Sequence, residues 1–202
     1  DREGKKMKLF NLWETQGIIL TDLSLKNSIT TTPRIVAKSQ GRNASQRLHR
    51  NKCNIVERLI TRLMVPGHKG KKHFKSSGKC SGKYLTTANI TIKTLKILEE
   101  RTKENPVQIL VTAIENAAPR EEITTVEYGG ARYPQAVDCS PTRRIDMALR
   151  IMVQGSYQKS FGKKIKMEAA LADEILAAYN FDQKSAAISK KLEMERMADA
   201  AR

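Results

Sequence analysis

Over one long stretch the sequence lacks acidic residues to balance its basic ones. Residues 23–98 contain seventeen lysines and arginines and one acid, Glu57. Residues 1–22 carry four charges of each sign and residues 99–202 sixteen of each, so the whole net charge of +16 lies within residues 23–98. Because a solvated helical surface normally mixes both signs, this imbalance predicts a polyanionic partner. Nucleic acid is the first candidate, and an anionic membrane surface or an acidic protein is the alternative.

The chain also lacks long hydrophobic runs and closely paired cysteines. Its longest mainly apolar run, residues 109–114, is far shorter than the roughly eighteen residues needed to span a bilayer. The charged first residues are not followed by an apolar block, which argues against a secretory signal. Three cysteines do not make a disulfide framework. We expect a cytoplasmic protein with no membrane partner, long enough to bury a core.

Signatures of catalysis and of metal binding are missing too. None of the glycine–lysine pairs within residues 70–83 has the spacing of a phosphate-binding P-loop. His68, His73 and Cys80 lie close together, but their spacing matches no zinc finger and a fourth ligand is lacking. Cys139 has no nearby histidine to act as a base, so a small buried thiol is the simpler interpretation. We expect no enzyme activity, no metal and no cofactor.

Apolar periodicity and end signals predict about six helices. They cover residues 55–64, 86–102, 106–118, 141–155, 163–179 and 186–202. Asn105-Pro106 and Ser140-Pro141 have the cap-then-proline pattern of a helix start, and Gly155 is expected to end the fourth helix. In the last helix Ile188, Leu192 and Met197 are expected to face inward. The alternation at residues 90–92 leaves a strand as an alternative there.

Two segments have a different character. Strand-favouring residues at 121–138 flank Gly129-Gly130, which predicts a β-hairpin. Residues 68–83 hold six lysines and no acid, so they are expected to be disordered or bound to phosphate. The predicted fold is mainly α, a bundle of about six helices with one protruding β-hairpin and a basic, partly extended N-terminal arm. The arm covers residues 1–52, with a short strand at 17–20 and an irregular loop at 38–52, and the helical domain covers residues 53–202.

Several basic residues are placed to meet RNA. The lysines of residues 68–83 can neutralise phosphates, and the interleaved Phe74 and Tyr84 either stack on unpaired bases or anchor the loop on the core. Arg143 and Arg144 fall in the first turn of a helix, against the preference of its dipole, so an anion is expected beside them. Together these residues predict a basic surface that joins the loop, the hairpin base and the fourth helix.

Ordered motifs carry a family resemblance. Residues 104–108 (ENPVQ), 113–116 (AIEN) and 119–121 (PRE) are followed by YGGARY at 128–133, VDCSPTRR at 137–144, ALR at 148–150 and ERMADA at 195–200. These motifs resemble the universal small-subunit ribosomal protein seven family over roughly residues 54–202. The long N-terminal part, including Gln40-Gly41-Arg42, resembles the archaeal and eukaryotic branch, because bacterial members are shorter.

The resemblance implies a non-enzymatic constituent of the small ribosomal subunit that binds the 3′ major domain of its rRNA early and nucleates assembly of the head. Its partners would be that rRNA, neighbouring head proteins, and the exit-site tRNA and mRNA. A nucleic-acid-binding module outside the ribosome is the alternative that charge alone would permit, and an RNA-modifying enzyme is a third with no identifiable acid–base pair.

The resemblance also implies site residues: the rRNA contacts would include Arg143, Arg144, Arg150 and the lysines Lys69, Lys71, Lys72, Lys75, Lys79 and Lys83. The basic charge of the remaining surface adds Arg42, Arg47, Arg50 and Arg120 to the expected rRNA contacts. The hairpin tip, Tyr128, Gly129, Gly130, Ala131 and Arg132, would face tRNA and mRNA. Bacterial hairpins carry arginines where this chain has Thr124, Thr125 and Glu127, which removes direct phosphate contacts expected from that strand.

Overall fold

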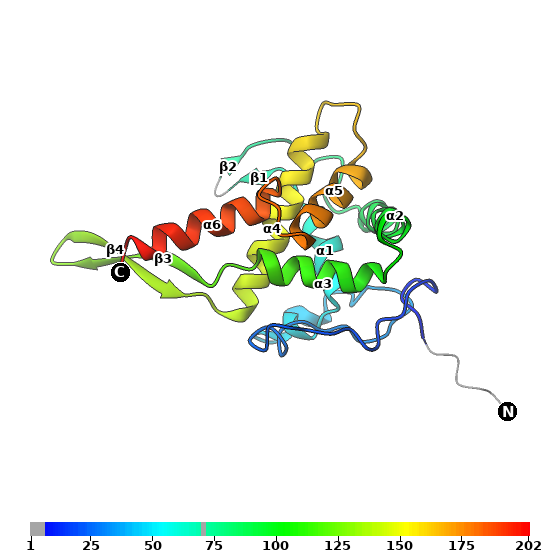
Figure 1. Cartoon of the computed structure of the whole chain (residues 1–202), viewed down its shortest axis with the longest axis horizontal. Coiled ribbons are helices and arrows are strands. Elements are labelled where there is room, and N and C mark those ends of the chain that lie inside the picture. The colour runs from blue at the N-terminus through cyan, green and yellow to red at the C-terminus, as the bar shows by residue number, and fades with distance from the viewer. Residues whose placement is uncertain (1–6, 70–71) are drawn as a thin grey trace.

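The computed structural model describes residues 7–69 and 72–202, and within them a bundle of six α-helices carries a long hairpin at one end (Figure 1). The helices are α1 (Ile55–Leu63), α2 (Tyr84–Thr102), α3 (Pro106–Ala117), α4 (Pro141–Ser160), α5 (Met167–Tyr179) and α6 (Ala186–Asp199). The strands are β1 (His68–Lys69), β2 (Lys72–His73), β3 (Glu121–Tyr128) and β4 (Ala131–Asp138), and two short 3-10 helices are η1 (Arg42–Ala44) and η2 (His49–Lys52). The predicted mainly α class is confirmed.

Local capping explains where three of the helices begin. The side-chain oxygen of Asn54 accepts a hydrogen bond from the backbone of Val56 at 2.9 Å, and that of Asn105 accepts one from Val107 at 3.0 Å. Ser185 caps α6 in the same way. Behind the caps, α5 packs against α2, α3 and α4, and the apolar sides of these helices form one core.

Several helix details differ from the prediction. Gly155 does not end α4, which continues to Ser160; a Cβ at Gly155 would lie 2.7 Å from the Cβ of Ala186, so this glycine instead permits the close approach of α6. Helix α5 begins at Met167, four residues later than expected. In α6 Met197 is 41% exposed and Ala198 is the buried residue of that turn. The strand alternative at residues 90–92 is wrong, because they lie inside α2.

The hairpin β3–β4 forms where it was predicted. Gly129 and Gly130 have φ values of 59° and 81°, the left-handed backbone that a tight two-residue turn requires and that glycine adopts without strain. The strands pair antiparallel, with Tyr128 opposite Ala131 next to the turn. The hairpin projects beyond the bundle, and α6 packs along its base (Figure 1).

The segment before α1 is extended and also packed. Residues 7–54 contain no helix longer than four residues, and their apolar side chains Leu9, Trp13, Leu25, Ile29 and Ala37 belong to the same core as the helices. In Figure 1 this segment runs beneath α3 and α1. Residue 52 therefore separates two parts of the chain that differ in sequence composition, but the two parts pack together in one core.

The short strand expected at residues 17–20 is not formed. The N–H of Ile19 donates to Gln108 Oε1 at 2.9 Å, and Gln108 Nε2 donates to the carbonyl of Ile19 at 2.9 Å. A single side-chain amide on α3 thus satisfies the backbone groups that a neighbouring strand would otherwise pair.

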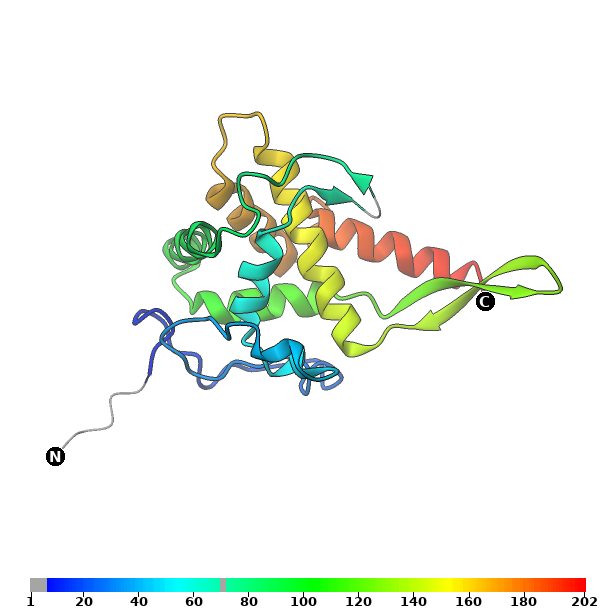
Figure 2. The ribbon, with the colours of Figure 1, turned by 180° about the vertical axis from the view of Figure 1, so that it is seen from behind.

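The lysine-rich segment after α1 is ordered over its described residues. The two-residue strands β1 and β2 pair antiparallel, and Figure 2 shows them beside α4. The hydroxyl of Tyr157 donates to the carbonyl of Ser76 at 2.5 Å, and Gln154 on α4 donates to the carbonyl of His68. Disorder is not found for these residues, because hydrogen bonds to backbone carbonyls, which no apolar pattern reveals, join the segment to α4. The alternative, that the segment binds phosphate, stays a prediction.

Candidate nucleic-acid interface

Arg144 lies inside the protein. Its side chain is 8% exposed; Nη2 lies 2.8 Å from Asp22 Oδ2, Nε donates to the carbonyl of Pro119 at 3.0 Å, and Nη1 donates to the hydroxyl of Ser24. Burial alone would raise the pKa of Asp22, but hydrogen bonds from Ser24 and Arg144 outweigh it and hold that pKa below its ordinary value. The anion expected beside this helix start is therefore a carboxylate of the protein itself.

Arg143, one residue earlier, points out of the bundle. Its Nε lies 2.5 Å from Glu122 Oε1 and its Nη2 donates to Glu122 Oε2 at 2.7 Å, while the side chain stays 57% exposed. The hydrogen bond that Arg143 donates to Glu122 raises the pKa of Arg143. Arg143 thus has one carboxylate partner and an open side toward solvent.

Asp146 is shared by two arginines. Arg58, with a 1% exposed side chain, donates from Nη2 to Asp146 Oδ1 at 3.0 Å and from Nη1 to the carbonyl of Ser28 at 2.9 Å. Arg50 lies 3.4 Å from Asp146 Oδ2. Burial lowers the pKa of Arg58, and the carboxylate of Asp146 raises it in part. The single negative charge of Asp146 is therefore shared by the two positive charges of Arg50 and Arg58.

Arg62 and Arg150 have no such partner. Arg62 is half-buried on α1, and its buried Nε has no hydrogen-bond partner among the described residues. Burial lowers the pKa of Arg62, and the charge of Arg150 lowers it further, while the carboxylate of Asp146 raises it in part. Arg150 is exposed and forms no ion pair in the described part of the chain. A phosphate would supply the acceptors that this pair lacks.

Arg62 was missed by the sequence reasoning. Its place in the acid-poor stretch, one helical turn after Arg58, was the available signal. Which of the two arginines turns inward depends on Asp146, which lies 88 residues from Arg58 along the chain.

The remaining predicted contact residues are mostly exposed. Those with no ion pair in residues 7–69 and 72–202 are Arg42, Arg47, Lys72, Lys79, Lys83 and Arg120. The Nζ of Lys75 lies 4.9 Å from the ring centroid of Phe161. Lys71 lies outside the described residues, as does the side chain of Lys69.

The two interleaved aromatic residues differ. The hydroxyl of Tyr84 donates to the carbonyl of Ala37, so this ring anchors the chain on the core, and burial raises its pKa to about 12. Phe74 is 58% exposed. Of the two alternatives, the anchoring role is therefore the one that Tyr84 fulfils.

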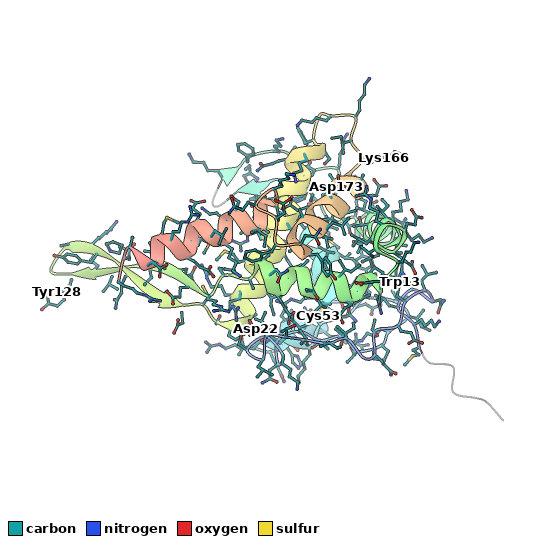
Figure 3. All side chains as sticks on the ribbon, in the orientation of Figure 1. Trp13, Asp22, Cys53, Tyr128, Lys166 and Asp173 are labelled. Atoms are coloured by element: carbon teal, nitrogen blue, oxygen red, sulfur yellow. The ribbon has the colours of Figure 1, made fainter. Side chains whose placement is uncertain are left out.

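The hairpin tip presents two unlike faces. Tyr128 is 82% exposed and points away from the bundle (Figure 3), and Val126 pairs with Tyr133 on the same face. On the opposite face Glu127 and Arg132 form a 3.6 Å ion pair. One face is thus aromatic and apolar, and the other carries charges that cancel.

The cysteines are poor candidates for chemistry. Burial, with the nearby charge of Glu122, raises the pKa of Cys139 to about 11, and burial together with Glu57 raises that of Cys53 to about 12. Both thiols are protonated at neutral pH, whereas a nucleophile needs a thiolate. Among the described residues no group of three or more His, Cys, Asp or Glu side chains is arranged to hold a metal, and no helix is long and apolar enough to cross a membrane.

The fold and this surface define a class: a small, basic, mainly helical protein that presents unpaired cations and an exposed hairpin to a polyanion. The family model described as ribosomal protein S7p/S5e matches residues 25–202. The chain is 50% identical to small ribosomal subunit protein uS7 of Nanoarchaeum equitans, over 98% of this chain and all of the relative. The uS7 proteins of Methanococcus maripaludis and Methanothrix thermoacetophila are 43% and 41% identical over 98% and 97% of this chain and all of their own length.

The chain therefore belongs to the ribosomal protein S7p/S5e family, as its ordered motifs predicted. Family membership makes it a structural, non-enzymatic component of the small ribosomal subunit that binds rRNA and takes part in translation. The relatives reported are archaeal, in agreement with the long N-terminal part.

Proposed function

We propose that this protein binds the 3′ major domain of small-subunit rRNA as a primary binder and nucleates assembly of the head together with neighbouring head proteins. The observation that carries the proposal is that neither Arg62 nor Arg150 forms an ion pair or a side-chain hydrogen bond in the described part of the chain, while the buried Nε of Arg62 has no acceptor there. An rRNA phosphate would supply the acceptors that these two guanidinium groups lack.

The surroundings of this pair extend the surface in both directions along α4. Arg143 and Arg150 are two helical turns apart, and Gln154 follows Arg150 by one turn on the same side. Gln154 holds the carbonyl of His68, so the lysine-bearing β1–β2 hairpin begins where the arginine row ends. Exposed cations therefore lie on α4 at Arg143 and Arg150, with Asp146 between them, and again at Lys72 on β2, and they support binding to a folded RNA.

Arg144 is omitted from the proposed contacts. The Nε and both terminal nitrogens of its guanidinium donate to partners within the chain. We assign it the task of holding the N-terminal segment against the start of α4.

A competition experiment tests the proposal. Purified protein is titrated with a 3′ major-domain rRNA fragment at physiological salt, with scrambled RNA of equal length as the competitor. A specific complex that survives the competitor is the expected result, because unpaired cations at fixed positions select shape as well as charge. Equal affinity for the two RNAs would contradict the proposal.

The hairpin serves a second part of the proposed function, contact with the exit-site tRNA and the mRNA. Its aromatic face supports contact with bases or ribose, and the Glu127–Arg132 pair leaves little net charge for phosphates on the other face. Deleting residues 128–132 should leave rRNA binding nearly intact while altering occupancy of the exit site by tRNA. Loss of rRNA binding in that variant would instead make the hairpin an assembly element.

A further inference from the structure

A cationic cavity of about 450 Å³ is lined by residues between Arg34 and Cys53, including residues of the two 3-10 helices η1 and η2. Arg34, Lys38, Arg42 and Lys52 contribute four positive charges to its lining. No carboxylate from the described part of the chain lines it. The cavity is separate from the Arg62–Arg150 pair, since neither of those arginines contributes to it.

The walls of the cavity are held in place by the bundle. The hydroxyl of Tyr84 on α2 donates to the carbonyl of the fully buried Ala37, and the N–H of Ser39 donates to Glu57 Oε1 on α1 at 2.6 Å. The Nζ of Lys38 lies 5.2 Å from the ring centroid of Tyr84. Because these contacts order the cavity without a ligand, binding would lose little conformational entropy.

The lining offers more than charge. Gln40 and Asn43 add side-chain amides, each with a donor and an acceptor, and His49 adds an imidazole ring. Amides of this kind pair with base edges, and an imidazole can stack on a base. A bare phosphate would use the cations but leave the amides and most of the space unfilled. The volume falls within the roughly 300–1,000 Å³ typical of sites for small organic ligands.

We propose that this cavity takes one unstacked nucleotide of the rRNA, with its phosphate on the cations and its base on the amides of Gln40 and Asn43. The inference rests on the proposed rRNA binding and adds to it a contact that depends on the base. Cys53 lies at the cavity wall as a protonated thiol, which fits a binding role better than a redox or metal role.

A titration with single nucleotides tests this directly. The full chain, labelled with ¹⁵N, is titrated by NMR with the four ribonucleoside monophosphates and, separately, with inorganic phosphate and uncharged nucleosides. We expect shifts confined to residues 34–53, tighter binding of the nucleotides than of phosphate, and different affinities for the four bases.

Three variants separate charge from base recognition. Arg42→Ala should weaken nucleotide binding about tenfold, the effect of one charge-assisted hydrogen bond. Asn43→Ala leaves the charge unchanged and should reduce the differences among the four bases. The matched control Lys164→Ala removes an exposed charge in the loop between α4 and α5 and should change neither result.

The outcomes of the single-nucleotide titration can be distinguished from those of the rRNA-fragment competition experiment. If phosphate binds as tightly as the nucleotides, or if no shifts appear, the nucleotide pocket is refuted while specific binding of the rRNA fragment can still stand. If that fragment shows no preference over scrambled RNA, the proposed function fails whatever the single nucleotides do.

Discussion

Helix α1 carries one buried (inward) arginine and one half-buried (outward) arginine, and α4 carries the buried Arg144 and the exposed Arg143 and Arg150. Arg58 and Arg144 are buried and meet the carboxylates of Asp146 and Asp22. Arg62, one turn after Arg58, and Arg150, six residues after Arg144, meet no carboxylate among the described residues. The comparison teaches that burial against an acidic partner, and not the type of residue, decides whether an arginine of these helices stabilises the fold.

The two pairs have opposite effects on the free protein. An inward arginine without its carboxylate leaves a buried charge uncompensated, so removal of either partner is costly. An outward arginine is exposed or lacks a carboxylate partner, so its removal should cost the free protein little and weaken the complex. The predictions below test this division, from the largest effect to the smallest.

Replacing Arg144 with Ala should lower the free energy of unfolding by about 3–5 kcal/mol, because Asp22 and the carbonyl of Pro119 lose their partner. Urea unfolding followed by circular dichroism measures it. The matched control is Arg143→Ala, whose exposed ion pair is worth about 0–1 kcal/mol. Similar losses of unfolding free energy in Arg144→Ala and Arg143→Ala would contradict the distinction between the buried and the exposed arginine.

The double variant Arg62→Met and Arg150→Met should weaken binding to the rRNA fragment and reduce the slope of its log–log salt dependence by about one unit per lost phosphate contact. Its free energy of unfolding should equal or exceed that of the unaltered protein, since a repulsion is removed. Affinity is measured at several salt concentrations, with Lys164→Met as the control. An unchanged slope would show that the outward pair does not meet phosphate.

Asp146→Asn removes the negative charge of the carboxylate that pairs with both the buried Arg58 and the partly exposed Arg50. Arg58 would keep a hydrogen bond but lose its charged partner, so the free energy of unfolding should fall by about 1–2 kcal/mol. Arg50 would be released, and affinity for the rRNA fragment should rise severalfold. Unfolding and RNA titration of the same sample measure both; a fall in affinity would contradict the assigned role of Asp146.

The smallest effect concerns pH. Because the pKa of Asp22 is held below its ordinary value in the folded protein, its contribution to stability is present above the unfolded pKa and disappears as pH falls through the folded one. Lowering the pH from 5 toward about 3 should therefore reduce the free energy of unfolding less in Asp22→Asn than in the unaltered protein. Parallel unfolding curves at each pH test this, and identical pH profiles would exclude Asp22 as a contributor.

The sequence predicted what is encoded locally. Asn105 marks the start of α3, and Gly129-Gly130 marks the hairpin turn, because a cap or a tight turn needs only residues next to it. Gly155 was misinterpreted for the same reason: a glycine that ends a helix and one that admits a neighbouring helix look alike until Ala186 is placed beside it.

The sequence predicted the candidate contact residues as a set but did not separate the buried ones from the exposed ones. The separation of Arg143 from Arg144 depends on Asp22, 122 residues from Arg144 along the chain, and periodicity carries no record of such a contact. The hydrogen bonds that hold residues 14–39 on the bundle could not be predicted from the apolar pattern, because they join polar side chains of α1 and α3 to backbone groups.

The polar side of α3 holds the N-terminal segment by its main chain. Asn105 donates to the carbonyl of Glu14 at 2.8 Å, Gln108 holds both backbone groups of Ile19, and Glu115 accepts from the N–H groups of Thr21 and Asp22 at 2.8 and 3.0 Å. Main-chain groups are the same in every residue except proline. Homologues can therefore exchange most side chains between residues 14 and 21 and keep the same docking, provided that the three polar residues of α3 are retained.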